Sequence, residues 1–110
     1  MVKRREAQLD LIFSALSDAT RRAILTRLEG GEATVSELAA PFAVSMPAIS
    51  KQLSVLEKAG LVERRKIGRV HHCRLRARPL SAAQKWLDRY RRFWEHNLDS
   101  LDRYLNEELT

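Results

Sequence analysis

The sequence predicts a mainly α-helical domain with one small β-hairpin. Apolar residues recur at helical spacing through residues 9–60, and the period becomes strand-like between residues 61 and 76. A long amphipathic segment then follows Pro79. The predicted order is therefore four helices, a two-stranded hairpin and one long helix. At 110 residues, of which 45% are hydrophobic, the chain fits one packed domain spanning 1–110.

The first two helices are predicted from apolar spacing and from a cap between them. Ser17 and Asp18 offer an N-cap for the second helix, and Gly30–Gly31 ends it. Side chains three or four residues apart lie on one face of a helix. The first helix has such an apolar face, formed by Leu9, Ile12, Phe13 and Leu16.

The third and fourth helices have clear start signals. Thr34 and Glu37 are spaced as a capping box, in which each side chain satisfies a backbone N–H of the first turn. Ser45 caps the fourth helix, Pro47 lies in its first turn, and Gly60 ends it. The residues expected to face the core are Val35, Leu38, Ala39 and Phe42 in the third helix, and Ile49, Leu53 and Leu56 in the fourth.

The hairpin and the last helix complete the predicted order. Residues 62–66 and 70–75 are the expected strands, with Gly68 at the turn between them. Pro79 interrupts the chain, and Ser81 is expected to cap a helix that runs close to the C-terminus. Such a helix would be roughly 45 Å long, at 1.5 Å per residue.

Charge and cysteine content restrict the class of protein. The chain has 20 Lys and Arg against 14 Asp and Glu, a net charge of +6, which favours a polyanionic partner. The single cysteine, Cys73, excludes an internal disulfide framework. The first ten residues lack an apolar stretch, and no run of about 18 apolar residues occurs, so we expect neither a signal peptide nor a membrane span. A cytoplasmic location is expected.

Two helices joined by a short turn and followed by a hairpin form the outline of a winged helix-turn-helix. The fourth helix is expected to expose small or hydrogen-bonding residues, which suits close approach to the major groove. Gln52 can pair with adenine, whereas Lys51 is better suited to a phosphate. An ordinary solvated helix face is the alternative. The outward residues are Ser45, Met46, Pro47, Ala48, Ser50, Lys51, Gln52 and Ser54.

The hairpin adds a basic cluster in the right place. Arg64, Arg65, Lys66 and Arg69 lie within six residues around Gly68, where we expect mostly phosphate contacts. Arg69 at the tip can also enter a narrow minor groove. The alternative is a solubilising charge run that protects an edge strand. The basic hairpin following a small-faced helix indicates double-stranded DNA as the partner.

These segments also resemble ArsR-type repressors. The resemblance is carried by residues 15–25 (ALSDATRRAIL), 45–53 (SMPAISKQL), 56–62 (LEKAGLV) and 68–70 (GRV), and covers residues 9–76 closely. It implies a homodimer formed by the first and last helices, with the fourth helix reading a palindromic operator and the hairpin as the wing. Residues 9–76 would then be the DNA-binding core, and residues 80–109 a dimerisation helix.

The last helix supports a dimer independently of the resemblance. Its apolar face is broad and rich in aromatic residues, and one small domain can hardly cover it. The alternatives are that it folds back on its own core or carries a ligand. The residues expected in the dimer interface are Leu9, Phe13, Trp86, Tyr90, Phe93, Trp94, Leu98 and Leu101.

Metal and enzyme sites are not expected. The resemblance implies metal sites made of cysteines in the third helix, or of acid and histidine pairs in the last, and this chain has neither set; Asp88 and His96 lack a second histidine. His71, His72 and Cys73 alternate across a strand, so they cannot converge on one ion or form a nucleophile with its base. We expect no cofactor. A metal- or redox-responsive repressor using these three residues, and an antitoxin or adaptor, remain the alternative functions.

Overall fold

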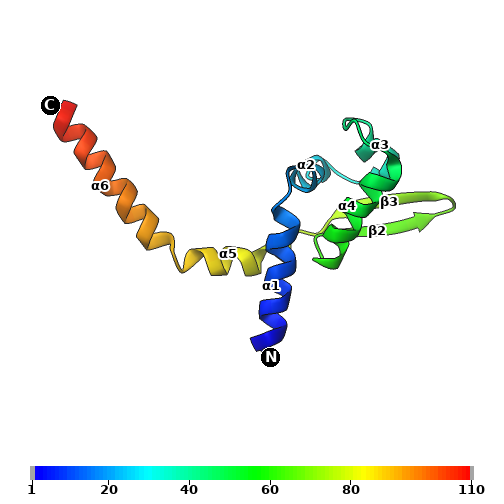
Figure 1. Ribbon diagram of the computed structural model, residues 1–110, viewed down its shortest axis with the longest axis horizontal. Coiled ribbons are helices and arrows are strands. Elements are labelled where there is room, and N and C mark those ends of the chain that lie inside the picture. The colour runs from blue at the N-terminus through cyan, green and yellow to red at the C-terminus, as the bar shows by residue number, and fades with distance from the viewer. Residues whose placement is uncertain (1, 110) are drawn as a thin grey trace.

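The computed structural model describes residues 2–109, and the side chains of residues 4–108 (Figure 1). Residues 1 and 110 of the predicted domain lie outside the described part. The elements are α1 (Val2–Leu16), α2 (Ala19–Leu28), β1 (Ala33–Thr34), α3 (Val35–Ala39), α4 (Met46–Lys58), β2 (Val62–Ile67), β3 (Val70–Leu75), α5 (Leu80–Asp88) and α6 (Arg91–Leu109). The predicted fold class, mainly α-helical with a hairpin wing, is confirmed.

The local start and stop signals act as predicted. The Asp18 carboxylate accepts a hydrogen bond from the Arg21 backbone N–H at 3.1 Å, and the Ser45 hydroxyl accepts one from Ala48 at 3.3 Å. Thr34 and Glu37 form both bonds of the capping box. Gly60 ends α4 with a φ of 78°, a left-handed conformation that favours glycine.

The sheet contains one strand that the sequence did not predict. β3 lies between β2 and β1, and both neighbours are antiparallel to it. β1 has only two residues, with Ala33 opposite Cys73 and Thr34 opposite His72. A two-residue strand has no detectable alternation, and it pairs here because the chain passes the free edge of β3 just before α3 begins.

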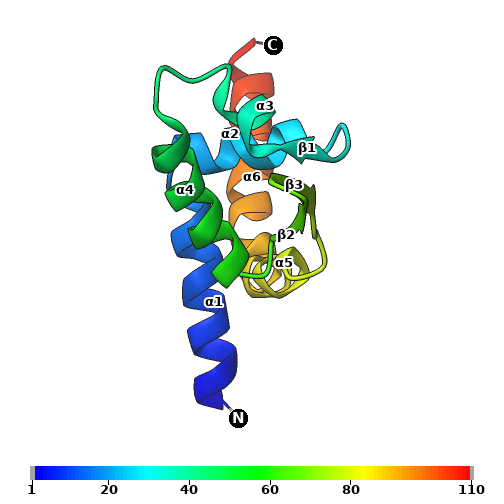
Figure 2. The ribbon, with the colours of Figure 1, turned by 90° about the vertical axis from the view of Figure 1, so that its right-hand side faces the viewer.

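The core lies between α1, α2, α3 and α4 and is closed by the base of the sheet (Figure 2). The inward residues predicted for the third and fourth helices are buried, except Phe42, which lies beyond the end of α3 and is only partly buried against the core. α5 contributes Ala83 to this core, and α6 contributes none of the described residues. The core-forming part of the chain therefore ends near residue 83.

The prediction of one continuous last helix is wrong. α5 ends at Asp88 and α6 begins at Arg91, and the backbone N–H groups of Arg89 and Tyr90 bond to carbonyls three residues earlier, at 3.3 and 3.0 Å. Ser81 does not cap α5, whose N-cap position is Pro79 without a side-chain hydrogen bond. The break contains neither proline nor glycine, so the sequence carries no signal for it.

α6 projects away from the rest of the molecule (Figure 1). The radius of gyration is 18.6 Å, whereas a compact chain of this length has about 13 Å. Within the described part, no helix is long and apolar enough to cross a membrane.

Candidate nucleic-acid interface

The apolar stripe of α4 is fully buried against the core, which holds the helix in place. Ile49, Leu53 and Leu56 are each 0% exposed, which fixes the rotation of the helix on the core. Ser45, Met46 and Lys51, from the predicted reading face, are exposed, while Ala48, Ser50 and Gln52 are half-buried. The outward face of α4 is therefore small and polar at its centre, with Ser50 and Gln52 on its two flanks.

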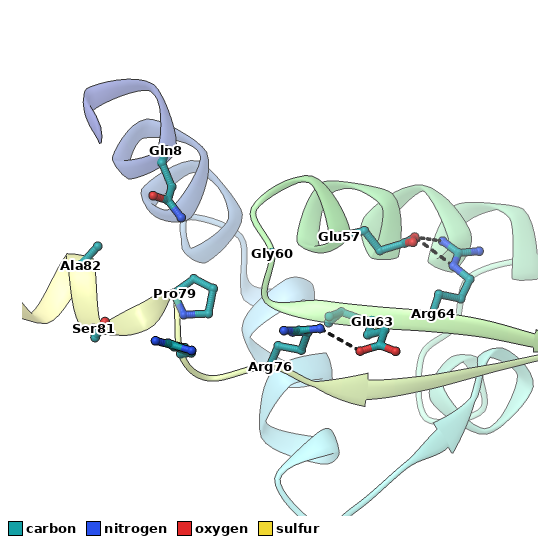
Figure 3. A pocket seen from close by; sticks show the side chains of 11 residues that line it. Gln8, Glu57, Gly60, Glu63, Arg64, Arg76, Pro79, Ser81 and Ala82 are labelled. Atoms are coloured by element: carbon teal, nitrogen blue, oxygen red, sulfur yellow. Dashed lines mark hydrogen bonds and ion pairs between the residues drawn. The ribbon is translucent and has the colours of Figure 1, made fainter. Parts of the chain in front are cut away.

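Arg64 joins the base of the wing, which is the hairpin of residues 62–75, to α4. Its guanidinium donates to the Glu57 carboxylate from Nε at 2.9 Å, to the Ser50 hydroxyl at 3.0 Å and to the Ser50 carbonyl at 3.2 Å. The ion pair with Glu57 is drawn in Figure 3, beside a second pair between Arg76 and Glu63. Because the Arg64 side chain is only 13% exposed and its donors are engaged, it holds the wing in place on α4.

The remaining basic residues of the wing are exposed. Arg65 lies at 3.4 Å from Glu32, a solvent-exposed pair of small energetic value. Lys66 and Arg69 have no ion-pair or hydrogen-bond partner among the described residues. Since side chains alternate along β2, Lys66 lies on the same face as Arg64, toward α4, and Arg65 on the opposite face. Lys66 and Arg69 are thus free to meet a phosphate backbone.

A groove separates the wing from the first turn of α4. Its volume is about 340 Å³, and it brings together four predicted residues, Met46, Ser50, Arg64 and Arg69. Sequence reasoning missed its other wall, which includes Thr34 and Ser36 at the start of α3. The signal for that wall was the capping box, which marks the start of α3, the first helix of the helix-turn-helix.

On the other flank of α4, a residue without a predicted site role contacts Gln52. The Arg21 guanidinium donates to Gln52 Oε1 at 2.6 Å. Arg21 lies in the first turn of α2, within the stretch 15–25 that resembles ArsR-type repressors, but the sequence carries no signal for its contact with Gln52. The candidate interface is therefore held from both sides by arginines, Arg64 from the wing and Arg21 from α2.

Comparisons with known proteins agree with this arrangement. Residues 16–65 match the family described as "Helix-turn-helix domain". The HTH-type transcriptional regulator Rv2034 of Mycobacterium tuberculosis is 39% identical over 99 residues, which are 90% of each chain. A crystal structure of the ArsR family transcriptional regulator RHA00566 superposes with a TM-score of 0.76 at 44% identity, covering 82% of this chain and 93% of that one.

This chain belongs to the ArsR family. It is a DNA-binding transcriptional regulator of the ArsR/SmtB type, and its family is one of regulators rather than enzymes. The transcriptional repressor SdpR of Bacillus subtilis is 34% identical over 76 residues, covering 69% of this chain and 84% of that protein. The winged helix-turn-helix prediction and the ArsR resemblance are confirmed.

His71, His72 and Cys73 are the residues considered above for a metal- or redox-responsive site. Among the described residues, no three His, Cys, Asp or Glu side chains gather in a way that could hold a metal ion. Cys73 is fully buried, and this burial raises the pKa of its thiol. His71 Nδ1 is the one buried side-chain nitrogen or oxygen without a partner among the described residues.

The residues predicted for dimerisation extend from the core into solvent. Phe13 of α1 and Trp86 of α5 pack edge to face, with ring centroids 5.6 Å apart, and contacts to Tyr90 and Phe93 continue the row. Leu9 and Phe13 are partly buried. Exposure rises along the row, from 38% at Trp86 to 56% at Phe93, and stays at one half or more at Trp94, Leu98 and Leu101.

Proposed function

We propose that this ArsR-family regulator is a homodimeric repressor of a palindromic operator. The observation that carries the proposal is the juxtaposition of a fixed, small-faced α4 with a basic wing across one groove. A recognition helix needs close approach to base edges, and the wing supplies positive charge for the backbone. As an operator-binding repressor, the protein is proposed to act in the cytoplasm.

We assign base reading to α4 and phosphate binding to the wing. Gln52 and Ser50 carry hydrogen-bonding groups on the two flanks of α4, while Ser45, Met46 and Ala48 lie near its N-terminal end. Lys51 lies on the exposed face and is assigned to a phosphate. Lys66, Arg65 and Arg69 form the clamp, and Arg64 contributes by holding the wing.

A second copy of the chain is the proposed occupant of the exposed apolar face. Large apolar side chains along α5 and α6 are half exposed, which is unusual for a monomer of this size. One similar solved structure, Mb0332 from Mycobacterium bovis, is described as a homodimeric winged helix-turn-helix domain and superposes with a TM-score of 0.59 at 26% identity. In a twofold dimer, the two α4 helices would read half-sites about 10 bp apart, or a multiple of that.

The test measures binding to the DNA upstream of the gene and to random DNA. It distinguishes base contacts by α4 from phosphate contacts by the wing. Lys66→Ala and Arg65→Ala should weaken operator and random DNA together, and each lost phosphate contact should reduce the slope of log affinity against log salt by roughly 0.9. Gln52→Ala should weaken the operator more than random DNA and leave the slope nearly unchanged. If Gln52→Ala weakened all DNA equally, or a wing variant changed sequence preference alone, these roles would be reversed.

A further inference from the structure

Arg21 is tied to the end of α1 by several hydrogen bonds. Its Nε donates to the Ala15 carbonyl at 2.9 Å, and one terminal nitrogen donates to the Ser14 carbonyl at 2.9 Å. These carbonyls belong to the last turn of α1, where no helical N–H follows and where a positive charge is favoured. These hydrogen bonds to α1 fix the orientation of the guanidinium plane independently of its contact with α4.

The other terminal nitrogen of Arg21 fixes the Gln52 amide. It donates to Gln52 Oε1 at 2.6 Å, a short hydrogen bond from a charged donor. An amide has its acceptor and its donor on opposite sides, so this bond turns Oε1 inward, toward α2. Among the described residues, Gln52 Nε2 has no hydrogen-bond partner. It is also not a buried unsatisfied atom, so it reaches solvent.

We propose that Arg21 is a specificity-determining positioning residue, which holds Gln52 so that only its Nε2 donor faces DNA. The proposal rests on the proposed function, because it concerns a side chain on the reading helix. Arg21 itself need not touch a base. Its effect is to select which end of the amide can read the major groove.

A donor-only amide predicts a particular base preference. A freely rotating glutamine pairs with adenine through both ends, accepting from N6 and donating to N7. With Oε1 engaged by Arg21, Nε2 is left to donate to an acceptor edge. Guanine, which presents only acceptors at O6 and N7, and thymine, which presents O4, fit this donor better than adenine.

The experiment compares base preferences of variants with intact folds. Wild type, Gln52→Ala, Arg21→Met and Arg22→Met are each used to select duplexes from a randomised pool, and affinities for all four bases are then measured at the affected positions. Arg22 is the matched control, because it also donates to an α1 carbonyl, that of Leu16 at 2.6 Å, but within the described part of the chain it forms no hydrogen bond or ion pair with α4. Thermal unfolding by circular dichroism checks each variant.

The expected result is a shift at one symmetric pair of positions. Gln52→Ala should flatten a preference for guanine or thymine there, and Arg21→Met should move it toward adenine by about three- to tenfold. Arg22→Met should leave it unchanged. Gln52→Glu provides a second variant that does not depend on removing Arg21: it keeps the acceptor for the guanidinium but lacks the donor, so it should lose the preference as well.

Several results would overturn the inference while leaving the regulator itself standing. They are an Arg21→Met variant with the preference of wild type, a wild-type preference for adenine at the position that Gln52→Ala affects, or no effect of Gln52→Ala at any position. Retention of the preference by Gln52→Glu would overturn it in the same way. A wild-type protein that selects no sequence from the pool would instead overturn the proposed function.

Discussion

α4 and α6 are both amphipathic helices, yet only one of them is covered by its own chain. The stripe of α4, formed by Ile49, Leu53 and Leu56, is fully buried. The stripe of α6 includes Trp94 and Leu98, which are 50% and 56% exposed. An apolar stripe at helical spacing is thus buried in α4 and exposed in α6. The difference is whether the monomer offers a surface against which the stripe can pack.

The two helices differ in whether a single chain covers their apolar faces. The part to which we assign DNA reading is packed within the monomer, with Arg64 and Arg21 holding the two flanks of α4. The C-terminal helices leave their apolar face open. We infer that folding of the core and assembly of the proposed dimer are separable.

The largest expected effect is a cavity under α4. Leu53→Ala removes a fully buried side chain, so it should lower the free energy of unfolding by about 2–5 kcal/mol. Leu98→Ala makes the same chemical change on α6 and should cost far less at a concentration where the protein is monomeric. Urea unfolding followed by circular dichroism measures both. Equal losses would show that α6 belongs to the same cooperative unit.

The next effect concerns assembly. Trp94→Glu places a charge in the apolar face of α6, and an unpaired charge in a desolvated interface is costly, so the variant should sediment as a monomer and bind the operator more weakly. His96→Glu adds a charge on the opposite side of the same helix and should leave assembly intact. A Trp94→Glu variant that still sediments as wild type would place the interface elsewhere.

A smaller effect distinguishes bracing from clamping within the wing. Arg64→Met removes charged hydrogen bonds to Ser50 and Glu57, so it should cost about 1–2 kcal/mol of stability as well as weakening DNA binding. Lys66→Met, on the same face of β2, should leave the unfolding midpoint unchanged and only weaken DNA binding. If both variants unfolded at the wild-type midpoint, Arg64 would not brace the wing.

The smallest effect is acid sensitivity at the start of α3. The Thr34 backbone N–H, followed by its hydroxyl, holds the pKa of Glu37 below its ordinary value. Because the folded-state pKa is the lower one, the stabilisation is present above about pH 4 and is lost as the pH falls through the folded pKa. Glu37→Gln keeps the capping geometry without a titrating group, so its unfolding midpoint should fall less between pH 6 and pH 3 than that of wild type. An identical fall would contradict this.

Local signals were enough to predict most of the fold. Caps at Asp18, Thr34 and Ser45 and the left-handed Gly60 act over a few residues, so they can be read in order along the chain. β1 could not be predicted, because its pairing depends on an edge supplied by β3 about 40 residues later. The break after Asp88 also lacked a signal, since it involves a tightened turn of ordinary helix-forming residues.

The candidate interface was predicted as a set of positions, but its contacts were not. Spacing placed Gln52 and Arg64 near DNA, yet both have long side chains whose direction depends on partners far away in the sequence. In the structure, Arg64 donates hydrogen bonds to Ser50 and Glu57, and Gln52 accepts one from Arg21. Periodicity gives the face of a helix or strand, whereas the use of each donor depends on the tertiary structure.

Sedimentation equilibrium at micromolar concentration, with and without an operator duplex, tests the central claim most directly. The free protein should have a mass of about twice 12.7 kDa, and the complex should contain two chains on one palindromic duplex. Trp94→Glu, measured alongside, should fall to the mass of one chain. A folded wild-type monomer of 12.7 kDa that binds the operator tightly as a single chain would contradict the account.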